Sequence, residues 1–231
     1  MGIHLNSKKF RALELSLVVA VAFAAPIFVA VYSLFSGSST GGTREPGVFV
    51  FYGLIYELLA IAVMVYVLAR QGRTLKEIGF FFSWKDLPVS LVLIVVSYLA
   101  FYICYVLVFY GYYYAGWPLT QPGETQTYLD AGLIFGTLLF ILVNPFYEEL
   151  IARAYVISEV KYLSGSTLMA VVISVGLQTS YHLYQGVPLA ISLGALSAVL
   201  SIYYVKYKRI VPVILAHLYF DLIALLMYAF R

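Results

Sequence analysis

The segment NPFYEELIARAY, residues 144–155, carries two adjacent carboxylates, Glu148 and Glu149, and one guanidinium, Arg153, at the end of a long apolar stretch. A charge inside a lipid bilayer is costly, so charged residues there usually mark a functional site. Arg153 follows Glu149 by four residues, which is the favourable spacing for an ion pair on a helix. Glu148 points about 100° away on a helix of 3.6 residues per turn. We therefore expect Glu149 to pair with Arg153, and Glu148 to be left free to act on water as a general base.

Other polar groups that could join this chemistry lie in later apolar stretches. His182 and His217 are two of the three histidines in the chain. Asp221 follows His217 by four residues and Gln178 precedes His182 by four, so each pair shares a helical face. We expect His182 to share or position the water on which Glu148 acts. His217 and Asp221 are expected to face the oxygen on which negative charge develops, as in an oxyanion site.

The elements that hold these groups are predicted to be membrane helices. The chain of 231 residues is 63% hydrophobic and 11% charged, whereas a soluble domain is about a quarter charged. Crossing a bilayer takes roughly 20 apolar residues of helix, and a helix satisfies its own backbone groups in lipid. We predict an all-α polytopic bundle of about seven transmembrane helices in a single domain, 1–231, with the motif-bearing core at 131–230. The predicted spans are 12–35, 48–69, 88–111, 131–157, 166–183, 188–207 and 210–230.

Charged residues outside these spans predict the orientation, because basic loops stay on the cytoplasmic side. Lys and Arg precede the first span and lie between spans two and three and between spans six and seven, whereas residues 112–130 contain none. We expect an integral protein of the cell membrane with its N-terminus in the cytoplasm and its C-terminus outside. The net charge of +3 is spread over these flanks, so no nucleic-acid partner is expected.

The turn at Ser164-Gly165 predicts that spans four and five form a hairpin. Glu148 lies 17 residues before Gly165 and His182 lies 17 residues after it. Equidistant residues of an antiparallel hairpin lie level, and His217 reaches a similar depth when counted from the start of span seven at 1.5 Å per residue. The sequence therefore predicts that ionisable groups from three spans converge in a chamber open to the cytoplasm.

Taken in order, these motifs resemble the CPBP family of intramembrane glutamic proteases, which includes the type II CAAX prenyl endopeptidases and the Abi bacteriocin-immunity proteins. The resemblance rests on Glu-Glu-x-x-x-Arg, a histidine in the next span and His-x-x-x-Asp, and it covers residues 148–221. It implies Glu148 as the base, His182 as its partner, and His217 with Asp221 as the pair that stabilises the oxyanion. Gln178 stands where the family usually has Phe, and Asp221 stands where its best-known members have Asn.

The resemblance also implies an endopeptidase without a cofactor. Its substrates would be membrane-associated proteins or peptides in the lipid bilayer. In one branch of the family, the enzyme removes the last three residues after a prenylated cysteine. Whether the substrates of this chain are prenylated is left open by the sequence.

Other functions stay open at this point. A zinc protease would use His182, His217 and a Glu as three ligands beside a water, although the chain has no His-Glu-x-x-His. A non-enzymatic immunity or interaction protein of the same fold is a second alternative. A transporter is a third, but the polar groups cluster at one depth and form no path. Two roles are open for Asp221, donation to the oxyanion or orientation of His217, and Glu57 is expected to be a structural partner or to line the chamber.

Overall fold

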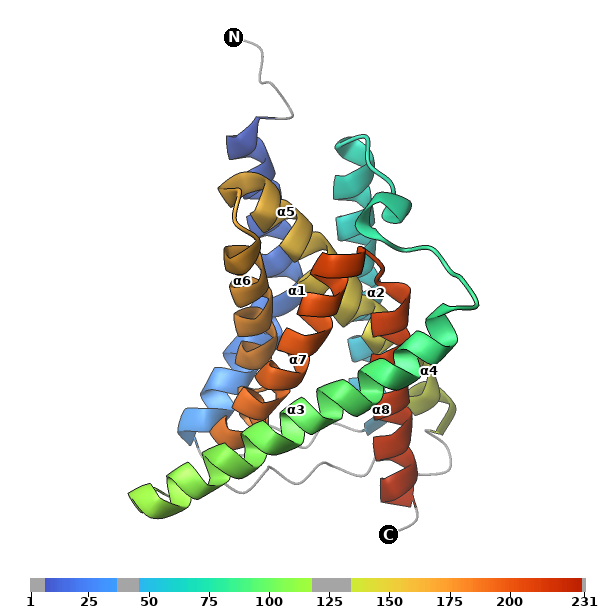
Figure 1. The fold of residues 1–231 in the computed structure, drawn as a ribbon. Coiled ribbons are helices and arrows are strands. Elements are labelled where there is room, and N and C mark those ends of the chain that lie inside the picture. The colour runs from blue at the N-terminus through green and yellow to red at the C-terminus, as the bar shows by residue number, and fades with distance from the viewer. Residues whose placement is uncertain (1–6, 37–45, 118–133, 230–231) are drawn as a thin grey trace.

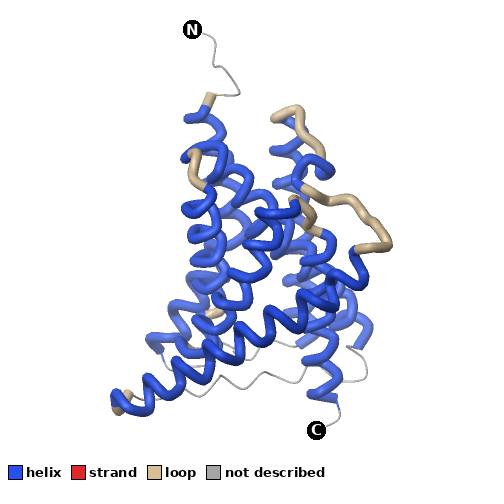
Figure 2. The backbone as a smooth tube through the Cα atoms, in the orientation of Figure 1, coloured by secondary structure: helices blue, strands red, loops and turns tan. Residues whose placement is uncertain are grey.

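The computed structural model describes residues 7–36, 46–117 and 134–229, and within these ranges it contains helices and no strand (Figure 2). The predicted all-α class is confirmed. The helices are α1 (Lys8–Ser36), α2 (Pro46–Arg70), η1 (Leu75–Ile78), α3 (Asp86–Ala115), α4 (Ile134–Glu148), η2 (Glu149–Tyr155), α5 (Val156–Ser164), α6 (Thr167–Tyr181), η3 (Leu183–Gln185), α7 (Val187–Tyr207) and α8 (Val211–Ala229). The predicted start of span four at 131–133, the end of span seven at 230 and most of the loop 112–130 lie outside the described residues.

Five helical stretches of the described chain are long and apolar enough to cross a membrane. They are α1, α2, α3, the continuous stretch from α4 through α5, and α7. The spans predicted at 166–183 and 210–230 correspond to α6 and α8, which are apolar but shorter. With 15 residues, α6 extends only about 22 Å at 1.5 Å per residue. The chain is an integral membrane protein built as a polytopic helical bundle.

Successive spans run in alternating directions, with α4, η2 and α5 forming one continuous span (Figure 1). In Figure 1, α1 begins at the top and α8 ends at the bottom, and α5 and α6 meet in a hairpin at the top. α6 packs against α1, α5 and α7, and α2 packs against α4. The long α3 runs obliquely across α7 and α8. The elements that carry the predicted site, α4, η2, α6 and α8, therefore face the interior of one bundle.

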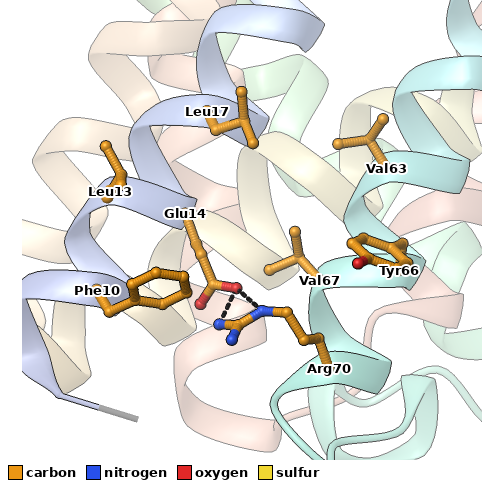
Figure 3. A pocket seen from close by; sticks show the side chains of 8 residues that line it. All are labelled: Phe10, Leu13, Glu14, Leu17, Val63, Tyr66, Val67 and Arg70. Carbon is orange, nitrogen blue, oxygen red and sulfur yellow. Dashed lines mark hydrogen bonds and ion pairs between the residues drawn. The ribbon is translucent and has the colours of Figure 1, made fainter. Parts of the chain in front are cut away.

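Ion pairs tie the helices together at the end of the bundle where α1 begins. Arg11 of α1 and Arg73, just after α2, both contact the buried carboxylate of Glu159 in α5. Glu14 of α1 pairs with Arg70 at the end of α2, beside an apolar groove of about 210 Å³ (Figure 3). Three of the basic residues that the sequence assigns to the cytoplasmic side, Arg11, Arg70 and Arg73, thus lie at one end of the molecule and neutralise buried carboxylates there.

The segment between α2 and α3 meets the turn between α7 and α8 at that same end, where Gly79 packs against this turn. The Ile210 N–H donates to the Gly79 carbonyl oxygen at 3.1 Å. A Cβ on Gly79 would lie 2.4 Å from the Lys208 carbonyl oxygen, and its φ of +87° is a conformation that favours glycine. Burial and the nearby charges of Lys161 and Arg73 lower the pKa of Lys208. This contact fixes where α8 starts, and so it sets the position of His217.

Candidate active site

The Glu-Glu-x-x-x-Arg motif lies on a change of helical geometry. α4 ends at Glu148, and the next seven residues, Glu149–Tyr155, form a π-helix whose side chains are all buried. The Val156 N–H donates to the Ile151 carbonyl, five residues back, which is the wider spacing that defines this geometry. Turns of this kind are rare and often coincide with functional sites. The two adjacent glutamates therefore begin a segment in which side-chain directions differ from those of a regular α-helix.

Glu148 is buried, with 7% of its surface exposed. The Tyr181 hydroxyl donates to its Oε2 at 2.7 Å, and Asn144 Nδ2 lies 3.4 Å from its Oε1. Two polar side chains that the sequence did not indicate therefore hold Glu148. None of the ion pairs among the described residues involves Glu148. Its charge is thus hydrogen-bonded but is not neutralised by a cation partner.

Glu149 has the partner that the spacing predicts and one more. It forms an ion pair with Arg153, so that prediction is confirmed. Its Oε1 also lies 2.9 Å from Nδ1 of His217 in α8. Because a carboxylate oxygen can only accept, we assign the proton of this contact to Nδ1. Glu149 therefore joins η2 to α8 and fixes the orientation of the His217 ring.

Arg153 is fully buried and contacts three different elements. Besides its ion pair with Glu149, its Nε donates to Ser201 Oγ at 3.1 Å and its Nη2 donates to Ser197 Oγ at 3.0 Å. Nη2 also donates to Gln178 Oε1 at 2.5 Å. The departure at Gln178 from the usual family residue thus has a structural role, since the amide oxygen accepts from the buried guanidinium where a Phe ring could not.

His182 lies directly after the end of α6 rather than inside a span. The helix ends at Tyr181, and residues 183–185 form a short 3-10 turn before Gly186 and α7. The His182 ring contacts the carbonyl oxygen of Gln178 through Nδ1 at 2.8 Å, so that nitrogen carries a proton. Its centroid lies 4.6 Å from that of the Tyr181 ring. His182 is therefore next to the residue that binds Glu148, and in the neutral ring Nε2 is available as an acceptor.

His217 and Asp221 form the second part of the site, on α8. His217 Nε2 lies 3.7 Å from Asp221 Oδ2, which is within ion-pair range but beyond a hydrogen bond. Both side chains are partly exposed, by 18% and 29%. The His217 ring thus has a carboxylate at each nitrogen, Glu149 at Nδ1 and Asp221 at Nε2.

Two residues that the sequence reasoning did not single out, Tyr181 and Asn144, are found beside the site, together with Glu57, which was expected to be a structural partner or to line the chamber. Tyr181 and Asn144 contact Glu148 directly, and Asn144 Nδ2 also donates to Glu57 Oε1 at 2.8 Å. Asn144 precedes Glu148 by four residues, a spacing that could have indicated the contact. Nothing in the sequence pattern distinguishes Tyr181 among the 22 tyrosines of the chain. Among the described residues, no group of three His, Cys, Asp or Glu side chains is arranged to hold a metal ion.

The fold and this cluster define an integral membrane protein with carboxylate, histidine and arginine side chains buried together inside a helical bundle. Residues 130–223 match a family model described as type II CAAX prenyl endopeptidase Rce1-like. The match includes every residue of the predicted site and confirms the family resemblance drawn from the motifs. No curated protein and no solved structure matches the chain. The family description supports a membrane protease, a hydrolase acting on peptide bonds, as the class of this protein.

Proposed function

We propose that the protein is a metal-independent intramembrane endopeptidase in which Glu148 activates the water that cleaves the peptide bond. The observation that carries this proposal is the contrast between two adjacent glutamates. Glu149 is neutralised by Arg153, whereas Glu148 is buried, hydrogen-bonded by Tyr181 and Asn144, and has no cation partner. A carboxylate in this state is suited to take a proton.

In the proposed reaction, Glu148 accepts a proton from water and the water oxygen bonds to the carbonyl carbon of the substrate. When the C–N bond then breaks, the amine leaving group takes that proton from Glu148. His182 supports the removal of the proton from water. Its Nε2 can accept a hydrogen bond from the other hydrogen of this water, because Nδ1–H is committed to the Gln178 carbonyl. Side chains alone supply the base and its partner, which supports a mechanism without a metal ion.

His217 is proposed to donate to the oxyanion through Nε2. Because its Nδ1 hydrogen points to Glu149, the ring can donate from Nε2 only when it is doubly protonated. Asp221 lies on the Nε2 side and stabilises that charged form. This geometry favours the orienting role for Asp221 over direct donation to the oxyanion. An ionised carboxylate has no hydrogen to donate, whereas an imidazolium held between two carboxylates does.

The proposed substrates are membrane-anchored proteins or peptides, cleaved near a prenylated C-terminus as the family description suggests. The gathering of basic residues at the end where α1 begins supports a cytoplasmic N-terminus and an outside C-terminus. The site would then be reached from the cytoplasm. Cys104 is the only cysteine of the chain, so single cysteines placed at Ser7 and Ser164 in a Cys104→Ala background can test which side is labelled by a membrane-impermeant reagent.

The decisive experiment is incubation of the purified protein with prenylated and unprenylated peptides that end in the same sequence. Glu148→Gln keeps the side-chain volume and removes the base, so we expect cleavage to fall by roughly 10² or more. Glu149→Gln is the matched control, and it should first lower stability because it leaves Arg153 without its anion. Wild-type turnover in Glu148→Gln would refute the assignment.

A second arm separates the glutamic from the zinc mechanism. Protein treated exhaustively with a chelator is expected to cleave at the untreated rate. If activity is lost and is restored by zinc, His182, His217 and a Glu become candidate ligands instead. If no peptide is cleaved under any of these conditions, the interaction-protein alternative replaces both mechanisms.

A further inference from the structure

The buried carboxyl groups of the described chain fall into two sets. Four of them have an arginine partner: Glu14 with Arg70, Asp86 with Arg209, Glu149 with Arg153, and Glu159 with Arg11 and Arg73. The other two, Glu57 and Glu148, are 3% and 7% exposed and have no cation within ion-pair distance. A buried carboxylate is normally paired, because an isolated charge is costly to take out of water. These two groups therefore require a different explanation.

Glu57 and Glu148 are joined by one side chain, Asn144. Its Nδ2 lies 2.8 Å from Glu57 Oε1 and 3.4 Å from Glu148 Oε1. An amide nitrogen has two hydrogens and can serve both acceptors. Glu57 comes from α2, whereas the other two lie four residues apart on α4. The contact thus places two carboxyl groups from different helices around a single nitrogen, in a buried setting without a compensating cation.

Two carboxylates that share a site in this way do not both ionise, because the second charge is opposed by the first. The contacts decide which of them keeps the proton. Glu148 receives a hydrogen bond from the Tyr181 hydroxyl as well as the amide, and both donors stabilise its ionised form. Glu57 Oε2 is buried and has no hydrogen-bond partner. The charge is therefore better placed on Glu148 and the proton on Glu57.

We propose that Glu57 is a positioning residue for Glu148, holding the single proton of a carboxyl pair that Asn144 joins. Neutral Glu57 accepts from Asn144 through Oε1, which orients the amide toward Glu148. Because Glu57 carries no charge, Glu148 alone is ionised and can take the proton of water. The kinetic part of this proposal rests on the proposed function of Glu148, whereas the location of the proton does not.

The charged groups around Glu57 are few. Glu148 and Tyr147 from α4, and His217 and Asp221 from α8, are close enough to interact with it electrostatically. The η2 segment contributes an ion pair that is neutral as a whole. In α1, no acidic or basic residue follows position 14. The state of Glu57 therefore depends mainly on Glu148 and on the pair in α8.

The location of the proton can be measured without turnover. The infrared C=O stretch of a protonated carboxylic acid shifts in D2O and can be recorded on the purified protein in lipid nanodiscs at neutral pH. We expect this band in the wild type and in Glu148→Gln, and its loss in Glu57→Gln. Glutamine resembles a neutral Glu, so Glu57→Gln leaves Glu148 in the environment that the proposal assigns to it. Glu148→Gln removes a neighbouring negative charge, but burial of the unpartnered Glu57 Oε2 still disfavours ionisation of Glu57.

The other outcomes of this measurement overturn the proposal. A band that is lost in Glu148→Gln shows that Glu57 does not keep the proton through its own burial. Absence of the band in the wild type shows that both groups are ionised, and its persistence in Glu57→Gln shows that another group carries it. Asp221→Asn is the control for the remaining partly buried carboxyl group, and it should leave the band in place. Because no cleavage is needed, a failure of the proposed protease function does not affect this result.

Kinetics test the positioning role. Glu57→Gln keeps the acceptor for Asn144, so we expect kcat within a few-fold of wild type and an acid limb of the pH–rate profile that does not move. Glu57→Leu removes the acceptor and should lower kcat by roughly tenfold or more while KM stays similar. A limb displaced to lower pH in Glu57→Gln, or full activity in a folded Glu57→Leu, would contradict the proposal.

Discussion

The buried guanidinium of Arg153 provides a quantitative test of how the site is held together. Arg153 is fully buried and connects η2 to α6 and α7 through Gln178, Ser197 and Ser201. Its only ion-pair partner among the described residues is Glu149. Replacing Arg153 with Met keeps much of the length and packing but removes the charge and its hydrogen bonds. Glu149 would then be a buried anion with His217 as its remaining polar partner.

Breaking a buried ion pair from one side costs about 3–5 kcal/mol, because the other charge is left uncompensated. We therefore expect Arg153→Met to lower the free energy of unfolding by this amount. In the double variant Glu149→Gln, Arg153→Met, no uncompensated charge remains, so much of the loss should be recovered. Ser201→Ala removes one hydrogen bond to the same guanidinium and should cost about 1 kcal/mol.

These values can be obtained by unfolding five proteins with SDS in mixed micelles, followed by circular dichroism: the wild type, Arg153→Met, Glu149→Gln, the double variant and Ser201→Ala. The double-mutant cycle isolates the interaction energy between Glu149 and Arg153, which for groups in contact is about 0.5–3 kcal/mol. The reasoning fails if Arg153→Met is no more destabilising than Ser201→Ala. It also fails if the double variant is less stable than Arg153→Met alone.

Three further changes test other parts of the site. Tyr181→Phe removes the hydroxyl that donates to Glu148, the proposed base. Since a hydrogen bond to a charged group contributes about 1.5–3 kcal/mol, kcat in the peptide assay should fall roughly 10- to 150-fold. Gly79→Ala places a Cβ against the Lys208 carbonyl at positive φ. It should lower the free energy of unfolding by about 1–3 kcal/mol, which is measured as a lower Tm. An unchanged Tm would show that the backbone around Lys208 can move to accommodate the methyl group. Asp221→Asn removes the carboxylate beside His217 Nε2 and should lower kcat by one to a few powers of ten, whereas full activity with an unchanged pH–rate profile would rule out the orienting role.

Local spacing made part of this site predictable from sequence. The four-residue spacing from Glu149 to Arg153 predicted their ion pair, and the pair is present even though the segment is a π-helix. The equal distances of Glu148 and His182 from Gly165 predicted that they lie level. The hydrogen bond from Tyr181, next to His182, to Glu148 supports that placement. Such inferences succeed because they depend only on regular helical spacing and on the position of the hairpin turn at Gly165.

Contacts between helices that are distant in sequence were not predictable in the same way. The hydrogen bond from Tyr181 to Glu148 was not predicted because Tyr181 approaches from another helix, and helix rotation about the axis is set by packing rather than by hydropathy. The partner of Glu57 depends on how α2 packs against α4. Gln178 looked like a departure from a family pattern, and only the buried position of Arg153 explains why an amide is useful there.

Charge balance connects the two parts of the site. Glu149 and Arg153 neutralise each other, and in the proposed reaction the charged His217 is balanced by Asp221. With the proton of the carboxyl pair on Glu57, the single uncompensated charge in the cluster lies on Glu148. That is the group which the proposed reaction requires to accept a proton, and accepting it removes the last unbalanced charge from a region where charge is costly. The same electrostatic cost that makes ionisable groups rare inside membranes would thus favour the first step of the reaction.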